Sequence, residues 1–178
     1  MSDKENNSSI NNLPAFKIAS LAILIAVTTV FTYIIRIPIA PTRGYINFGD
    51  VAIFFTAITF GPITAFLAGG LGTALADLFA GYAQWAPITF FAHGLQGLVV
   101  GLILRKKINI TGLILSFLAA TIVMAGIYYI TAGFMYGFGP ALAEIPGNIL
   151  QNVAGIAVGV PLAAAVRKAY PPILNYKW

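Results

Sequence analysis

Cysteine is absent from this 178-residue chain, charged residues make up only 8% of it, and histidine occurs once, at position 93. Without cysteine, the chain has no disulfide and no thiolate ligand for a metal. A single histidine among scattered carboxylates argues against the usual metal-ligand sets, so we expect no metal site. The chain also lacks the G-x-x-x-x-G-K-[ST] sequence that binds phosphate in ATPases, so it does not hydrolyse ATP through a P-loop. We expect no cofactor in this chain.

Apolar residues dominate the composition. They make up 59% of the chain, and the mean hydropathy is +0.88, which is more than a soluble domain of this size can bury. The net charge of +5 would suggest nucleic acid in a soluble protein, but here the basic residues lie between apolar segments and are interpreted as topology signals. We therefore predict an all-α integral protein of the cell membrane, surrounded by lipid and without a nucleic-acid partner.

Six apolar segments approach the length of about 20 residues that a membrane span requires. They cover residues 16–35, 48–61, 62–80, 86–104, 111–135 and 144–166. The second segment is short enough to be tilted or partly buried by its neighbours, and Gly61-Pro62 predicts a tight turn after it. The expected organisation is a disordered cytoplasmic tail, residues 1–13, followed by a single six-helix transmembrane domain, residues 14–178.

Lysine and arginine are distributed unevenly between the two sides of these spans. If the N-terminus is cytoplasmic, the outer segments contain only Arg36 and Arg43. The inner segments then contain eight basic residues: Lys4, Lys17, Arg105, Lys106, Lys107, Arg167, Lys168 and Lys177. Because basic residues concentrate in cytoplasmic loops, this distribution predicts that both termini are cytoplasmic.

In this topology, almost every polar group within a span lies in the outer half of the membrane. These groups are Asn47, Asp50, Asp77, Thr89, His93, Gln96, Tyr128, Tyr129, Tyr136, Glu144, Asn148, Gln151 and Asn152. An ionisable side chain at membrane depth costs roughly 2.5–3.5 kcal/mol on insertion scales and usually faces a bundle interior or a wet cavity. Polar groups at one depth on five spans therefore predict a single cavity open to the outside.

Each of these groups also has a purely structural explanation. Asp50 could cap a helix, Asp77 could mark the membrane interface, and His93 could be a hydrogen-bonded packing residue. Glu144 and Asn148 lie four residues apart on one helix face, which could hold neighbouring helices together instead of binding a ligand.

Small residues form a second pattern. Alanines recur at spacings of four, three and four along the first span, at Ala15, Ala19, Ala22 and Ala26, and glycines repeat at Gly97-xxx-Gly101 and Gly155-xxx-Gly159. Such stripes let helices approach closely, and internal packing is their usual explanation. The alanine stripe, however, begins at the cytoplasmic end, away from the polar cavity, and could dock a separate protein.

Short motifs follow one another in a fixed order along residues 44–103: G-D, F-G-P, L-x-D-L-x-x-G, W-x-P-x-T and G-L-x-G-x-x-x-G. The sequence E-I-P-x-N-x-x-Q follows at residues 144–151. This order resembles the substrate-binding S components of energy-coupling factor (ECF) vitamin transporters, particularly those for riboflavin or for hydroxymethylpyrimidine, the thiamine precursor. The similarity covers nearly the whole chain after the tail.

The resemblance implies a six-helix unit that binds a vitamin near its outer face, under the loop between the first two spans. It also implies an alanine-x-x-x-alanine motif that docks a transmembrane coupling protein, the T component. Ala22 and Ala26 match this motif, and Ala19 extends it. Two ATPase subunits, which hydrolyse ATP, complete such assemblies.

Together, the residues and the resemblance predict a set of substrate-binding side chains. The set consists of Asn47, Asp77, Trp85, His93, Gln96, Tyr128, Glu144, Asn148 and Gln151. Aromatic faces with amides and carboxylates suit a small planar heterocycle bearing amino or hydroxyl groups. We expect hydroxymethylpyrimidine as substrate, then pyridoxine or riboflavin. Arg36 and Arg43 could attract a phosphate or anchor the outer loop at the interface.

Two other classes of protein remain open from the sequence. An autonomous secondary transporter or channel would move a small heterocycle without a partner. An intramembrane enzyme could use the embedded carboxylates for acid and base chemistry, but no nucleophile motif, metal set or aspartyl dyad signature is present. We predict no catalytic residue.

Overall fold

The computed structural model of the protein describes residues 14–105 and 108–175. The predicted cytoplasmic tail, residues 1–13, lies outside the described residues, as do Lys106, Lys107 and Lys177.

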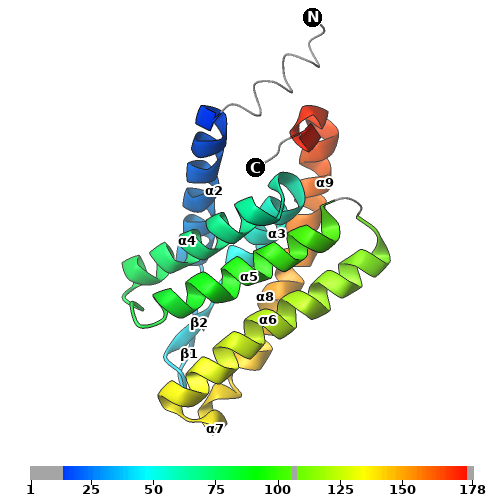
Figure 1. Cartoon of the computed structure of the whole chain (residues 1–178). Coiled ribbons are helices and arrows are strands. Elements are labelled where there is room, and N and C mark those ends of the chain that lie inside the picture. The colour runs from blue at the N-terminus through cyan, green and yellow to red at the C-terminus, as the bar shows by residue number, and fades with distance from the viewer. Residues whose placement is uncertain (1–13, 106–107, 176–178) are drawn as a thin grey trace, which may run out of the picture.

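The described residues form a helical bundle with one small hairpin (Figure 1). The elements are α2 (Pro14–Ile34), β1 (Ile37–Ile39), β2 (Gly44–Ile46), α3 (Gly49–Phe60), α4 (Pro62–Ala80), α5 (Ala86–Leu104), α6 (Ile110–Tyr136), α7 (Phe138–Ala141), α8 (Glu144–Ala154), the π-helical turn η1 (Gly155–Gly159), α9 (Val160–Ala169) and the 3₁₀ turn η2 (Pro171–Asn175). Within the described ranges, five helical stretches are long and apolar enough to cross a membrane, with α7 to α9 counted as one, and α3 is a shorter apolar helix. The protein is therefore an all-helical membrane protein apart from the hairpin.

Helix ends follow local backbone chemistry. Gly61 adopts a φ of 95°, and Pro62 begins α4 directly after it, as the Gly-Pro pair predicts. Gly81 ends α4 in the left-handed conformation, where its N–H reaches the carbonyls of Asp77 and Leu78. The Asn109 side chain accepts a hydrogen bond from the Gly112 N–H and caps α6. The observed limits of α4 and α5 are those predicted, 62–80 and 86–104.

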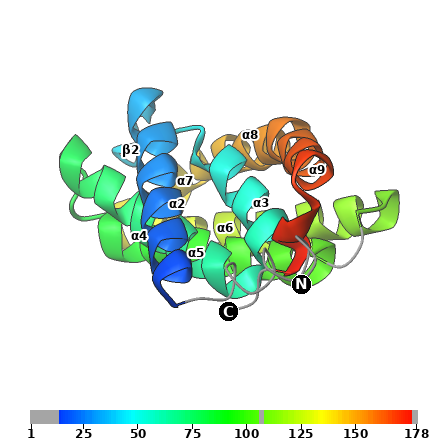
Figure 2. The same ribbon diagram turned by 90° about the horizontal axis from the view of Figure 1, so that it is seen from above.

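Helix α3 occupies the middle of the bundle. Figure 2 shows it between α2 and α9, and ten of its twelve residues are buried. Twelve residues span about 18 Å at a rise of 1.5 Å per residue, which is less than the hydrocarbon thickness of about 30 Å. The short second span is therefore enclosed by its neighbours, as predicted, and its first turn lies deep within protein.

The last span is not the continuous helix over 144–166 that we expected. Helix α8 passes through the π-helical turn η1 into α9, and the short α7 precedes it. A Cβ atom on Gly155 would lie 2.6 Å from the Phe54 ring, and one on Gly159 would lie 2.6 Å from the Val51 carbonyl. This close packing against α3, together with the N–H group that Pro161 lacks, accounts for the interruption.

A β-hairpin connects α2 to α3, in a region where we predicted only a loop. Strands β1 and β2 pair antiparallel, with Ile37 opposite Ile46 and Ile39 opposite Gly44. Arg43, in the connecting turn, adopts a positive φ of 52°. Figure 1 shows the hairpin beside α7, at the end of the bundle opposite the start of α2.

The small-residue stripes have different surroundings. A Cβ atom on Gly97 would lie 2.9 Å from the Ala65 carbonyl, and one on Gly101 would lie 2.6 Å from the Pro62 Cα, so this pair packs α5 against α4. The four alanines of α2, in contrast, are all exposed on the surface of the bundle: Ala15, Ala19, Ala22 and Ala26. Among residues 14–105 and 108–175, nothing packs against the alanine stripe that would account for its spacing.

Candidate ligand-binding site

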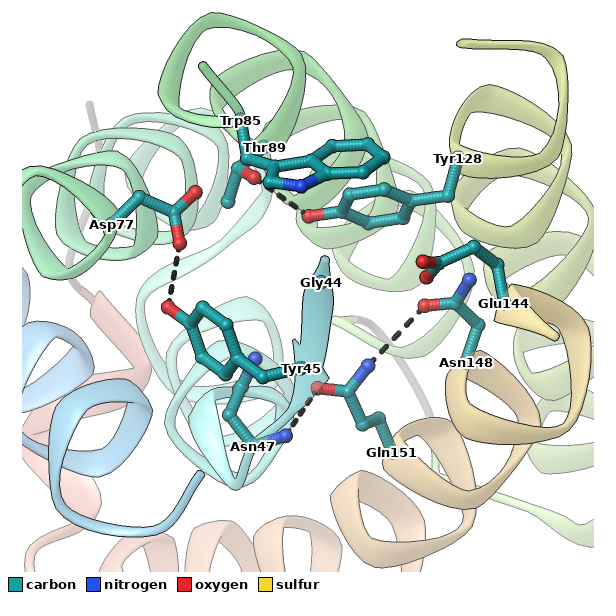
Figure 3. A pocket seen from close by; sticks show the side chains of 10 residues that line it. All are labelled: Gly44, Tyr45, Asn47, Asp77, Trp85, Thr89, Tyr128, Glu144, Asn148 and Gln151. Carbon is teal, nitrogen blue, oxygen red and sulfur yellow. Dashed lines mark hydrogen bonds between the residues drawn. The ribbon is translucent and has the colours of Figure 1, made fainter. Parts of the chain in front are cut away.

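A pocket lies beneath the hairpin, between the ends of four helices (Figure 3). Seven of the nine predicted substrate-binding residues line it: Asn47, Asp77, Trp85, Tyr128, Glu144, Asn148 and Gln151. Gly44, Tyr45 and Thr89 complete the lining. The pocket thus combines hairpin residues with side chains from α4, α5, α6 and α8. That these residues contact a substrate stays a prediction.

One wall of the pocket is aromatic. The Trp85 ring lies 5.6 Å from the Tyr128 ring and 6.0 Å from the Tyr136 ring, measured between centroids. The Tyr128 hydroxyl donates to the Thr89 hydroxyl at 2.8 Å, which fixes the ring. Trp85 is only 3% exposed, so contacts with the surrounding protein hold its ring in place.

The opposite wall comes from one face of α8. Glu144, Asn148 and Gln151 recur at helical spacing, and all three are buried. Gln151 Nε2 donates to Asn148 Oδ1 at 3.3 Å, which orients the Asn148 amide. The Glu144 carboxylate accepts a hydrogen bond from the Thr42 hydroxyl, in the turn of the hairpin.

Two buried polar atoms in the lining make no hydrogen bond of ordinary geometry among the described residues, although the Thr89 hydroxyl lies close to the Asp77 carboxyl. They are Asp77 Oδ2 and Asn148 Nδ2, an acceptor and a donor from different helices. Figure 3 shows the two side chains on facing walls of the pocket. Because leaving a buried polar group unpaired costs about 1–3 kcal/mol, a pair of this kind marks a place where a ligand can restore hydrogen bonds.

Four hydrogen bonds hold the hairpin over the pocket. Besides the bond between Thr42 and Glu144, the Tyr45 hydroxyl donates to Asp77 Oδ1 at 2.6 Å. The other two are the Asn47 N–H to Gln151 Oε1 at 2.8 Å and the Trp85 indole N–H to the Arg43 carbonyl at 3.2 Å. These bonds join the hairpin to α4, α5 and α8.

The space left at the centre of the pocket is small. Its volume of ≈ 20 Å³ is about that of one ordered water, whereas sites for small molecules measure roughly 300–1,000 Å³. In this conformation the pocket is therefore too small for an organic ligand. Tyr45 contributes to the closure through the hydrogen bond from its hydroxyl to Asp77. Burial, followed by the nearby Asp77 charge, raises the pKa of this phenol.

His93 and Gln96, the other two predicted binding residues, do not line the pocket. They lie one turn deeper along α5, where they join Asp50 and Asn152 in a buried polar cluster. His93 has the surroundings of a hydrogen-bonded packing residue, which is the structural alternative that the sequence left open for it. Among the described residues, no group of three histidine, aspartate or glutamate side chains is arranged to hold a metal ion.

Apolar helices around a pocket with aromatic and polar side chains define a helical membrane protein with an embedded pocket. Comparison with protein families gives the particular family. Residues 12–168 match the model of the ECF-type riboflavin transporter, S component. The chain belongs to this family of multi-pass membrane proteins, which are transporter components and not enzymes.

Two curated relatives cover most of the chain. A protein of Pyrococcus woesei, described as an uncharacterized protein in a gap 3' region, is 40% identical over 147 residues, which is 83% of this chain and 99% of the relative. The thiamine precursor transporter HmpT of Lactococcus lactis subsp. cremoris (strain MG1363) is 33% identical over 153 residues, or 85% of this chain and 88% of the relative.

Proposed function

We propose that the chain is the substrate-binding subunit of an ECF-type importer, which captures a vitamin or vitamin precursor at the outer face of the cell membrane. A separate transmembrane coupling protein and two ATPase subunits complete the importer. The spans number six when α3 is counted, and both termini are cytoplasmic. The family membership and the distribution of basic residues support this arrangement.

Hydroxymethylpyrimidine is the proposed substrate, with pyridoxine and then riboflavin as the alternatives. The observation that supports it is the unpartnered pair in the pocket, Asp77 Oδ2 and Asn148 Nδ2. An aminopyrimidine has an amine whose two N–H groups can donate to the carboxylates of Asp77 and Glu144. It also has a ring nitrogen that can accept from the Asn148 amide and flat faces for Trp85 and Tyr128. A relative named for transport of a thiamine precursor also supports this choice. Riboflavin has three fused rings and would require a much larger opening.

Ligand binding by the purified protein tests the substrate. Mass spectrometry of the detergent-purified protein should detect a co-purified pyrimidine, and calorimetric titration should give the highest affinity for hydroxymethylpyrimidine. Titrations with pyridoxine and riboflavin provide the comparison. Tighter binding of either one would replace the proposed substrate while leaving the binding function in place.

The exposed alanine face of α2 is the proposed docking surface for the coupling protein. Ala19, Ala22 and Ala26 lie on the surface, where a second helix can approach the backbone closely. Replacing Ala22 and Ala26 by leucine should abolish recovery of the coupling protein in a pull-down while leaving ligand affinity unchanged. Val27→Leu, at an exposed neighbouring position, is the matched control. Normal assembly of the double variant would contradict this role.

Reconstitution separates the proposed subunit from an autonomous transporter. Liposomes that contain only this chain should bind substrate without accumulating it, whereas liposomes that also contain the coupling protein and both ATPases should accumulate it with ATP. Uptake by the chain alone would reject the proposal in favour of a secondary transporter or channel.

A further inference from the structure

A layer of four buried side chains lies directly below the pocket. It consists of Asp50 on α3, His93 and Gln96 on α5, and Asn152 on α8, each at most 1% exposed. Two of them follow a pocket-lining residue by one helical turn: His93 follows Thr89 on α5, and Asn152 follows Asn148 on α8. Asp50 lies in the first turn of α3. Since a turn of helix advances about 5.4 Å, the layer forms the floor of the pocket.

Gln96 is the centre of this layer. Its Nε2 donates to Asp50 Oδ2 and to Asn152 Oδ1, both at 2.9 Å. Its Oε1 lies 2.9 Å from His93 Nδ1, which is also 3.1 Å from Asp50 Oδ1. Both amide protons face oxygen acceptors, and a flipped amide would place oxygen against oxygen, so a single orientation of Gln96 fits.

Asn152 extends this hydrogen-bond network to α8. Its Oδ1 accepts from Gln96, while its Nδ2 donates to the Asn148 carbonyl at 3.0 Å and contacts Met124 Sδ at 3.4 Å. One side chain therefore connects α8 with α5, with α3 through Gln96, and with α6. No other hydrogen bond between α8 and α5 is seen among the described residues.

The position of α8 determines two properties of the pocket. Glu144, Asn148 and Gln151 on α8 form the polar wall. Glu144 and Gln151 also accept two of the four hydrogen bonds that hold the hairpin. The opposite contact, from Tyr45 to Asp77 on α4, is independent of α8.

We propose that Asp50, Gln96 and Asn152 are positioning residues for ligand recognition. They do not contact the ligand; they fix α8 so that its polar wall meets the ligand and the hairpin closes. This inference rests on the proposed binding function, and the family relationship does not supply it. If the layer only stabilised the bundle, its loss would weaken all contacts between the pocket and the ligand alike. If it positions α8, its loss weakens the contacts that α8 makes.

Asn152→Ala is the sharpest test, because it cuts the connection to α8 and leaves the contacts among Asp50, His93 and Gln96 in place. We expect affinity for hydroxymethylpyrimidine to fall about ten-fold, as for one lost buried hydrogen bond. The loss should be smaller when Asn148→Ala is already present, because one of the α8 contacts is then already gone, and should persist in full beside Asp77→Asn. Equal losses in both backgrounds would overturn the proposal. Gln96→Met, which removes the layer's central amide, should show the same pattern.

A ligand-free measurement keeps this test separate from the proposed function. In a Trp178→Phe background, iodide should quench Trp85 weakly in the parent protein, because the hairpin covers that ring. Asn152→Ala should raise the quenching constant, since two hairpin bonds depend on α8. The control is Ser116→Ala, which removes a buried hydroxyl near the start of α6, at the end far from Tyr128. It should leave the quenching constant unchanged. If the parent protein binds none of the three candidate ligands, the proposed function fails. Unchanged quenching in folded Asn152→Ala would separately overturn the positioning role.

Discussion

The charge on Glu144 should determine how strongly the pocket binds an amine-bearing ring. Glu144 is 4% exposed and accepts the Thr42 hydroxyl through Oε1. Glu144→Gln retains an oxygen for Thr42, so the hairpin keeps its attachment. The second carboxylate oxygen becomes an NH₂ group, which cannot accept a hydrogen bond from a ligand amine.

The size of the effect follows from the kind of contact that is lost. A hydrogen bond to a charged group contributes about 1.5–3 kcal/mol, so the dissociation constant for hydroxymethylpyrimidine should rise about 10- to 150-fold. A pyrimidine that lacks the ring amine does not use the carboxylate in this way. Its affinity should be nearly the same for the parent protein and for Glu144→Gln.

Calorimetry with both ligands, on protein shown to be folded and monodisperse, makes the comparison. Thr42→Val is the complementary variant, because it detaches the hairpin from Glu144 and leaves the charge in place. It should speed dissociation of both ligands by the same factor in stopped-flow measurements of Trp85 fluorescence. If Glu144→Gln leaves both affinities unchanged, the carboxylate serves only the hairpin, and our account of ligand recognition is refuted.

Three further predictions concern topology, packing and closure. Because the chain has no cysteine, Arg43→Cys should react with an impermeant maleimide on intact cells and Lys168→Cys only after permeabilisation; the reverse result would invert the bundle. Gly101→Ala places a Cβ 2.6 Å from an α4 backbone carbon and should destabilise the protein in thermal unfolding by about 1–3 kcal/mol. Gly126→Ala, whose Cβ would have nothing within 4 Å, should stabilise it by about 0.5–1 kcal/mol. Burial raises the pKa of Tyr45, so its protonated phenol contributes stability that is complete below about pH 10. This contribution declines above that pH, because Tyr45 ionises in the unfolded chain before it does in the folded protein. Tyr45→Phe should lack this part of the decline.

The sequence predicts spans well where a chemical boundary interrupts the apolar pattern. Gly61-Pro62 predicted the boundary between α3 and α4, and the structure has it at that pair. The hairpin was missed because strands of three residues, in a segment with two prolines, leave too short a pattern for strand prediction. The π-helical turn was also missed, since its cause is contact with α3, although Gly155, Gly159 and Pro161 were visible signals.

The site was predictable in composition but not in depth. Helical spacing placed Glu144, Asn148 and Gln151 on one face, and these residues line the pocket. His93 was expected in the pocket from its depth along the span, but it lies one turn below the pocket. Periodicity identifies the face of a helix, but the vertical position of one helix relative to another depends on tertiary packing. Tyr45 was missed because only the hairpin brings it over Asp77.

The connection between α2 and β1 has a mechanical consequence. Helix α2 ends at Ile34 and β1 begins at Ile37, so two residues join them, and these can span no more than about 7 Å when fully extended. A translation of α2 along its axis beyond that slack must displace β1 as well. The exposed alanines lie between residues 15 and 26 of α2, and the cover of the pocket follows the last residue of this helix. A displacement of α2 along its axis therefore acts on that cover directly through the two-residue connection, in addition to any effect through the helices that pack against α2.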